Sequence, residues 1–214
     1  MTKRISAASA FLALMASPAL AHHPLGGEVP QTVVNGVLSG IGHPIIGFDH
    51  LAFVLGIGLL AAFQKSRFVL PAGFVAGTVL GTLMIISGVT LPAVELVITA
   101  SVLMVGVLAM MGRALPAAGA GVVAAGAGLF HGWAYGEAVI GAEPTPLIAY
   151  MAGFGVTQMA IAVGAMFAAQ WVMTPRGDDA VMANLKPRLA GAMVAGVGLT
   201  YLVEIAEAAI FPAM

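Results

Sequence analysis

Residues 43–62 read HPIIGFDHLAFVLGIGLLAA, a stretch that joins three polar side chains, His43, Asp49 and His50, to a long apolar run. A membrane-spanning helix needs about 20 mostly apolar residues to cross a hydrocarbon core of roughly 30 Å. Residues 45–63, which extend this stretch by Phe63, are about long enough to meet this requirement. The stretch predicts a first transmembrane helix over residues 45–63, with the polar side chains close to its beginning.

The whole chain shares this apolar character. Of its 214 residues, 60% are hydrophobic and 8% are charged, whereas an average soluble domain has about 25% charged residues. The 28 glycines point the same way, because small residues let membrane helices pack closely. The composition therefore predicts an all-α membrane protein with no room for a soluble domain.

Several classes of function are excluded by what the sequence lacks. The chain has no cysteine, which excludes disulfides, thiolate metal sites and cysteine nucleophiles. A formal net charge of −1 without a basic stripe excludes nucleic-acid binding. The phosphate-binding sequence G-x-x-x-x-G-K-[ST] is also absent, so we expect no nucleotide to drive the protein.

The N-terminal segment, residues 1–21, has the features of a cleaved signal peptide. Lys3 and Arg4 form a positively charged start, a short apolar core follows, and Ala-Leu-Ala ends the segment. The apolar core is short for a membrane-spanning helix. Cleavage after Ala21 would leave His22 as the new N-terminus, outside the cytoplasm.

Six apolar stretches, each about long enough to span a bilayer, follow in the rest of the chain. They cover residues 45–63, 68–87, 92–111, 116–133, 146–173 and 188–211. We therefore expect a six-helix transmembrane domain over residues 45–214. Residues 22–44 are rich in glycine and proline, and we expect an extracytoplasmic arm there with a short surface or re-entrant helix.

Positive charge is confined to one side of this predicted bundle. The basic residues after the signal peptide all follow helices one, three and five: Lys65, Arg67, Arg113, Arg176, Lys186 and Arg188. Because cytoplasmic loops carry the excess of Lys and Arg, this side is predicted to be cytoplasmic. The chain is then a multi-pass protein of the bacterial inner membrane, with both mature termini in the periplasm.

The ionisable side chains within the predicted helices gather near the opposite, periplasmic side. The candidates on helices one, four and six are His43, Asp49, His50, His131 and Glu204. Ionisable groups are costly inside a membrane, so each is a candidate functional residue. Imidazoles and carboxylates without sulfur suit borderline divalent cations such as nickel, cobalt and zinc.

The spacing of His43 and His50 decides whether both can bind one ion. On an unbroken helix they would share a face but lie about 10.5 Å apart, too far for a common ion. Pro44 and Gly47 predict a break, with the helix starting at Pro44 and His43 folded back over its first turns. Asp49 would then bind the ion directly or orient a neighbouring imidazole.

A simpler interpretation of the same polar residues is structural. A histidine at a membrane interface often only donates a hydrogen bond to a backbone carbonyl, because backbone polar groups in a membrane need partners within the protein. Gln158, near the middle of the fifth predicted helix, is either a hydrogen bond between helices or a ligand along a pore. The convergence of several histidines and acids on one side favours the metal site.

Three features of the sequence resemble the HupE/UreJ family of hydrogenase and urease accessory proteins. They are a signal peptide ending in Ala-His, the stretch at residues 43–62 and FHGWAYGE at residues 130–137. The resemblance runs over essentially the whole mature chain. It implies a six-helix nickel permease, or in some members a cobalt permease, and it carries the family's metal ligands over to His43, Asp49 and His50.

The second motif departs from the family pattern Phe-His-Gly-x-Ala/Val-His-Gly-x-Glu. His131 matches the first histidine of the pattern, but Tyr135 stands at the second. Ala138 stands at the glutamate, and Glu137 lies one position earlier. One imidazole of the family pattern is therefore missing, which bears on the metal preference and on the transport kinetics.

Together these observations predict a secondary permease or channel-like carrier, and not an enzyme. Its cargo would be nickel for hydrogenase or urease maturation, so the bound ion is a substrate and no cofactor is expected. A divalent cation gains roughly 4.6 kcal/mol on moving inward across about 100 mV, which drives uptake without coupling. The expected ligands are His43, Asp49, His50, His131, His22 and Glu204. Expected partners are the ion, the lipid bilayer and metalloenzyme maturation proteins.

Three alternatives remain open. The first is cobalt uptake for cobalamin synthesis, which uses the same ligand chemistry. The second is a zinc-dependent intramembrane hydrolase, although the sequence has no HExxH pair and neither Ser39 nor Ser87 lies in a G-x-S-G setting. The third is a metal-binding partner in metalloenzyme assembly that transports nothing.

Overall fold

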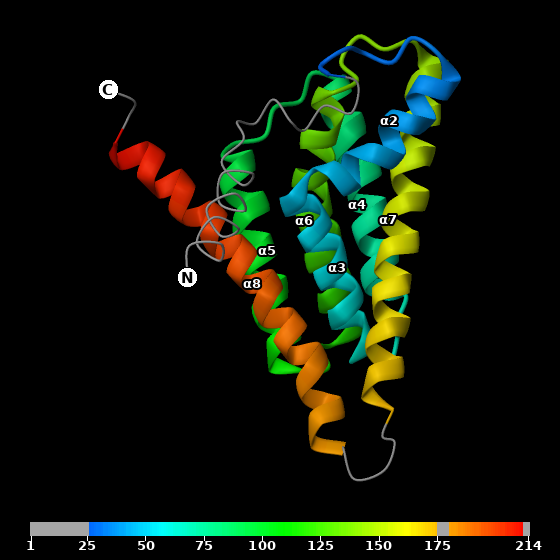
Figure 1. Ribbon diagram of the computed structural model, residues 1–214. Helices are drawn as coiled ribbons and strands as arrows, with labels where there is room; N and C mark the ends of the chain where they lie inside the picture. Colours follow the sequence, from blue (N-terminus) through cyan, green and yellow to red (C-terminus); the bar gives the residue numbers. More distant parts are fainter. Residues whose placement is uncertain (1–25, 175–179, 212–214) are drawn as a thin grey trace, which may run out of the picture.

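The computed structural model of the chain describes residues 26–174 and 180–211, and every regular element in these ranges is an α-helix (Figure 1). The helices are α2 (Val33–Ile46), α3 (Phe48–Ala62), α4 (Val69–Ile86), α5 (Val94–Met111), α6 (Ala117–Glu137), α7 (Pro144–Met173) and α8 (Ala180–Ile210). The all-α prediction is confirmed. The predicted signal peptide, His22 and Arg176 lie outside the described residues.

The helix bounds follow ordinary start and stop signals. α7 begins at Pro144, where a missing backbone N–H costs nothing, and α5 ends at Gly112, which adopts a left-handed φ of 62°. α8 begins at Ala180, ahead of the expected residue 188. The predicted first residue was that of the apolar segment that would span a membrane, whereas the helix itself can begin before this segment, in water.

Several helices are long and apolar enough to cross a membrane. Among the described residues these are α4, α5, α7 and residues 185–210 of α8, and the bent pair α2 and α3 passes the same test as one broken span or re-entrant loop. α6 falls outside this set, since it is rich in glycine and contains His131 and Glu137. The chain is a multi-pass membrane protein, and six spans remain a prediction.

The break between α2 and α3 is the most marked irregularity of the bundle. The two helices meet at Gly47 with a bend of 78°, so α2 lies across the end of α3 (Figure 1). The sequence predicted a break with the helix starting at Pro44, whereas Pro44 lies inside α2. A Cβ at Gly47 would lie 2.7 Å from Cδ2 of His50, so a larger residue would push this ring.

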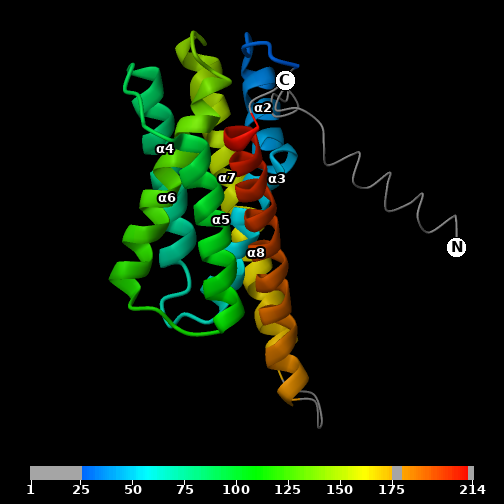
Figure 2. The same ribbon diagram turned by 90° about the vertical axis from the view of Figure 1, so that its left-hand side faces the viewer.

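Glycines set the distance between neighbouring helices. A Cβ at Gly81 of α4 would collide with the Leu129 carbonyl of α6, and one at Gly132 of α6 would collide with the Thr78 carbonyl of α4. α4 and α6 accordingly lie side by side (Figure 2). Gly40 brings α2 equally close to α7. Small residues at such contacts are the usual means by which membrane helices approach one another.

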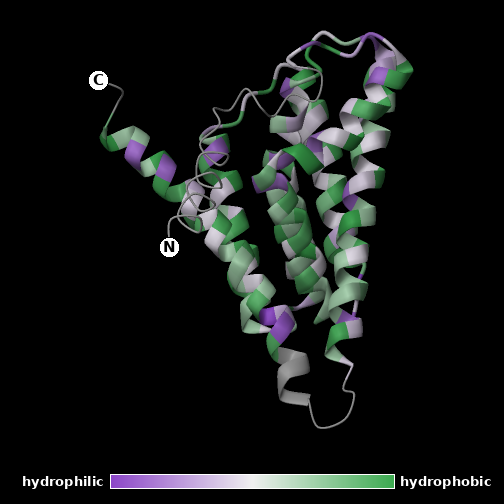
Figure 3. Cartoon of the chain, viewed as in Figure 1, coloured by the Kyte–Doolittle hydropathy of each residue, from purple (hydrophilic) through white to green (hydrophobic). Residues whose placement is uncertain are grey.

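Charge is unevenly distributed along the bundle. All Lys and Arg side chains within the described part of the chain lie at the end where α3 and α5 finish and α8 begins: Lys65, Arg67, Arg113, Lys186 and Arg188. The flanks of the helices are mainly hydrophobic (Figure 3). The histidines and Asp49 lie toward the opposite end. This separation is the one that the loop sequences predicted.

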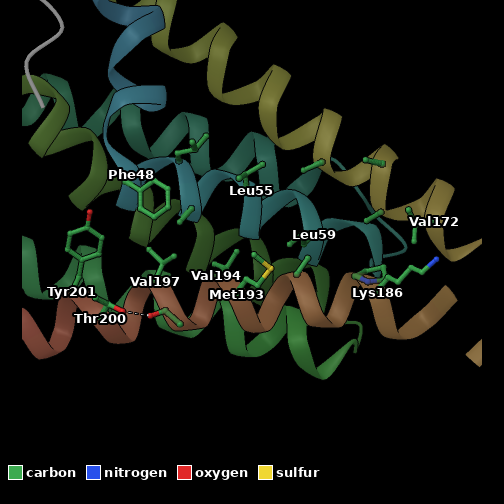
Figure 4. Close-up of a pocket in the computed structure, with 18 of the residues that line it drawn as sticks. Phe48, Leu55, Leu59, Val172, Lys186, Met193, Val194, Val197, Thr200 and Tyr201 are labelled. Atoms are coloured by element: carbon green, nitrogen blue, oxygen red, sulfur yellow. Dashed lines mark hydrogen bonds between the residues drawn. The ribbon is translucent and has the colours of Figure 1, made fainter. Parts of the chain in front are cut away.

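The two faces of α3 have opposite characters. Its outer face borders an apolar groove of about 820 Å³ between α3, α7 and α8. Phe48 and Leu55 of α3 face Met193 and Val197 of α8 across this groove (Figure 4). The inner face of α3 instead carries buried His50, which turns toward α6.

Candidate metal centre

Three histidines from three helices meet inside the bundle. His43 of α2, His50 of α3 and His131 of α6 are 3%, 4% and 0% exposed. The ring centroids of His43 and His50 lie 5.9 Å apart, and those of His50 and His131 lie 5.0 Å apart. The bend at Gly47 makes this possible, since it turns the end of α2 back over the first turn of α3.

His131 is held on both sides of its ring. Its Nδ1 lies 2.8 Å from Nδ1 of His50, and its Nε2 lies 3.0 Å from Oγ of Ser101 on α5. The Ser101 hydroxyl also donates to the Ile98 carbonyl at 2.6 Å. The His131 ring also packs against Phe53 and, nearly at a right angle, against Phe74, at centroid distances of 4.3 and 5.6 Å. Both ring nitrogens of His131 are therefore engaged within the protein.

His43 is tied to α7 through a tyrosine. Its Nδ1 lies 2.7 Å from the hydroxyl of Tyr150, and this hydroxyl donates to the Tyr135 carbonyl at 2.8 Å. Tyr150 is fully buried beside Phe154. The contact joins α2, α6 and α7 at one point and fixes the orientation of the His43 ring.

Tyr135 fills the space between the two other imidazoles. Its ring centroid lies 4.7 Å from that of His43 and 4.5 Å from that of His50. Within the described part of the chain, its hydroxyl and Nε2 of Gln158 are buried without a close hydrogen bond, and the two side chains lie near enough to interact with each other. The Gln158 Oε1 accepts from Thr78 at 2.9 Å, which is a hydrogen bond between α7 and α4.

Asp49 stands next to the histidines in the chain but is placed differently. It lies in the first turn of α3, is half-buried, and its Oδ1 accepts from the backbone N–H of His50 at 2.8 Å. A carboxylate is stabilised at this end of a helix by the backbone dipoles. The geometry is that of a group at the edge of the site, where it can orient the start of α3.

The two other predicted ligands are not part of the histidine cluster. Glu204 is exposed on α8 and lines the apolar groove on the outer face of α3. His22 lies outside the described residues. Across residues 26–174 and 180–211, no group of three His, Cys, Asp or Glu side chains is placed so that it could enclose a metal ion. The arrangement offers imidazoles in pairs and not a closed cage.

Two residues of the site were missed by the sequence reasoning, Tyr150 and Ser101. Each is a polar side chain within an apolar helix, a signal that could have marked it as a candidate. Nothing in the sequence says which imidazole either one meets, because both contacts join helices far apart in the chain.

Comparison with known proteins covers most of the chain. The family model described as HupE / UreJ protein matches residues 10–201. The chain is also 31% identical to Protein HupE of Rhizobium leguminosarum bv. viciae over 147 residues, which are 67% of this chain and 72% of that protein. No solved structure matches. The matched range includes all three histidines of the cluster.

Proposed function

This chain belongs to the HupE/UreJ family, and we propose that it takes up a divalent transition metal ion, nickel, as a secondary permease or channel-like carrier. The observation that supports this most directly is the meeting of three imidazoles from α2, α3 and α6 inside a membrane bundle. Polar groups at such depth are costly, and imidazole is a preferred ligand of nickel, cobalt and zinc.

The pair His43 and His50 has the right separation for one ion. Two imidazoles bound to a common ion at about 2.0–2.1 Å per bond have ring centroids roughly 4.5–6.5 Å apart. The observed separation of 5.9 Å falls in this range. Asp49, at the edge of the site, supplies the negative charge that attracts a cation.

An incomplete ligand set suits a carrier. A site for passage must bind the ion strongly enough to admit it and weakly enough to release it. Structural zinc sites, by contrast, enclose the metal with four protein ligands. We propose that the ion keeps some of its water here, and that Glu204 and His22 act only in attracting it at the outer mouth.

The distribution of charge supports an inward direction of transport. We propose that the end with Lys65, Arg113 and Lys186 is cytoplasmic, by the positive-inside rule, and that the histidines face the periplasm of the inner membrane. A reporter active only in the periplasm should be active when fused after Met214 and silent when fused near Asp179. The reverse result would overturn this orientation.

The test of the function is uptake by the purified protein in liposomes. With an inside-negative potential, we expect accumulation of radioactive nickel that stops when the potential is abolished. Competition by cobalt and by zinc, measured at equal concentrations, separates nickel uptake from the cobalt alternative. No uptake of any of the three ions, by protein shown to be inserted and folded, would contradict the proposal.

A further inference from the structure

We propose that the apolar groove between α3, α7 and α8 binds one acyl chain of an anionic phospholipid, whose phosphate contacts Lys186. The groove lies on the opposite side of α3 from the histidine cluster, so the proposal does not depend on metal transport. Three features support it: the space beside α8, the apolar lining of this space, and the cation at one of its ends.

The groove exists because glycines hold α8 against α5. A Cβ at Gly106 of α5 would collide with the backbone of Ala195 on α8, and one at Gly198 of α8 would collide with the backbone of Leu103 on α5. On its other side α8 carries Met193, which lines the groove and is 75% exposed. The close contact with α5 therefore leaves a space of about 820 Å³ between α8 and the helices α3 and α7.

The lining of the groove is small and apolar. Gly196 contributes to it from α8, and a Cβ built there would meet nothing within 4 Å. The α7 side includes Ala165, Ala168 and Ala169. In the core of a bilayer such a surface meets hydrocarbon and not water, and an unfilled gap would lose dispersion contacts. A slender, unbranched apolar chain matches this lining.

The length of the groove suits an acyl chain that starts at the basic end of the bundle. Lys186 lines this end (Figure 4), and Gly196 follows ten residues later on α8. At 1.5 Å per residue the two lie about 15 Å apart along the helix axis, which is half of a hydrocarbon core of roughly 30 Å. A chain with its phosphate at Lys186 would therefore end near the open space at Gly196.

Charge complementarity selects an anionic headgroup. Lys186 is exposed where it lines the groove. The acidic side chains within residues 26–174 and 180–211 all lie toward the opposite end of the bundle. Arg188, which is close in the chain, donates to the Met110 carbonyl at 2.7 Å. A lipid phosphate would complement the charge of Lys186, as basic pockets between membrane helices commonly do for anionic headgroups.

A second copy of this chain is the other candidate occupant, and the same lysine argues against it. Two copies that pair about a two-fold axis along the membrane normal bring equivalent residues to the same depth. The two Lys186 ammonium groups would then lie at one level of a shared interface and repel each other. A phospholipid instead neutralises this charge.

The direct test is native mass spectrometry of the detergent-solubilised protein with added phosphatidylglycerol, which is anionic, or phosphatidylcholine, which is zwitterionic, both with the same acyl chains. We expect one phosphatidylglycerol to be retained per chain at low lipid concentration. Lys186→Gln should weaken this binding about fivefold, the effect of one basic residue at an anionic surface. Lys65→Gln, which removes a cation of the same end outside the groove, is the matched control and should change nothing.

Filling the groove tests the place of the acyl chain. Gly196→Leu and Ala168→Leu each put a branched side chain into the space, so each should weaken phosphatidylglycerol binding by at least about tenfold, the effect of about two buried methylene groups. Gly126→Leu on α6 is the matched control, because a Cβ there also meets nothing within 4 Å but lies outside the groove.

Thermal stability gives a second measurement. A ligand that binds only the folded state stabilises it, so phosphatidylglycerol should raise the melting temperature of the delipidated protein and of Gly126→Leu, but not that of Gly196→Leu. Equal retention of the two lipids by the unmodified chain, or unchanged binding in both filling variants, would overturn the proposal. A dimer that dissociates in Gly196→Leu would assign the groove to a second copy and would equally overturn it.

Discussion

Two polar clusters lie near each other in the apolar interior, and their hydrogen bonds are organised differently. In the histidine cluster, both chains of hydrogen bonds end on a backbone carbonyl, of Tyr135 and of Ile98. In the second cluster, formed by Tyr135, Gln158 and Thr78, two buried polar atoms of the described structure lack a close hydrogen bond. Thr78 packs against Gly132, one turn before Tyr135 on α6.

Under the proposed function, this difference would separate the residues that bind the ion from those that lie along its path. A chain of hydrogen bonds with fixed ends holds its rings in one orientation, as a binding site needs. A buried polar atom without a partner costs about 1–3 kcal/mol, and it can gain a partner when water or an ion arrives. We therefore expect capture to depend on the histidine cluster and the rate of passage to depend on the second cluster.

The largest effect is expected for the two histidines of the proposed pair and for Asp49 at the edge of the site. His43→Ala, His50→Ala and Asp49→Ala should each lower nickel uptake by more than about 100-fold, since even the partners of ligands contribute 10–100-fold. Uptake is measured at matched membrane abundance, with Thr82→Val as the control for a buried polar side chain. Normal transport by the two histidine variants would reduce the cluster to a structural network.

A smaller effect is expected for His131→Ala. The substitution removes the ring whose Nδ1 lies 2.8 Å from Nδ1 of His50, so uptake should fall by about 10–100-fold, the usual effect of removing a partner of a metal-bound histidine. Raising the nickel concentration should recover part of the rate, because binding and not passage is impaired. A loss as complete as that of His50→Ala, with no recovery at any concentration, would make His131 a ligand.

Gly47→Ala should have an intermediate effect that depends on one ring. The backbone at Gly47 has φ −69° and ψ 100°, which alanine also adopts, so the effect comes from the new Cβ, which would lie 2.7 Å from Cδ2 of His50 and 3.3 Å from the His43 carbonyl oxygen. We expect about a 10-fold rise in the half-saturating concentration, within the range for displaced ligand partners. Gly164→Ala, where a Cβ meets nothing within 4 Å, is the matched control.

Gln158→Leu should affect the second cluster alone. It removes the Thr78 contact and the unpartnered amide nitrogen, so the maximal uptake rate should fall by about 2–10-fold, the effect of one hydrogen bond on a barrier. The half-saturating concentration should not change. A change confined to thermal stability, with both kinetic constants normal, would show that Gln158 only joins α7 to α4.

The smallest effect is expected for Tyr135→His. The ring of Tyr135 already lies 4.7 and 4.5 Å from the two imidazoles, so a histidine there adds a third ring to the pair. Uptake should stay the same or rise. Tyr135→Phe keeps the ring and removes the unpartnered hydroxyl, and it serves as the comparison. Loss of uptake in Tyr135→His alone would show that the site cannot accept another imidazole.

Parts of the candidate site could be predicted from sequence. His43 and His50 share the segment with Pro44 and Gly47, so a break that brings them together was predictable. Its position at Gly47, and not at Pro44, was not, because an interior proline removes one backbone hydrogen bond and can kink a helix without ending it, and Pro44 lies inside α2. Glu204 illustrates the limit: the sequence predicted it as a ligand together with the histidines, whereas it lines the groove on the outer face of α3.

The sequence by itself determined the class of the protein, the approximate helix bounds and the end at which basic residues gather. These follow from local physics, since the length of an apolar run is matched to a bilayer and charge is read loop by loop. Only the tertiary structure decided that α6 packs on α4 through Gly81 and Gly132, and that Ser101 and Tyr150 meet His131 and His43. Such pairings depend on which helices are neighbours. The lipid-facing and helix-facing surfaces of these helices are both apolar, so the sequence carries little pattern that would identify the neighbours.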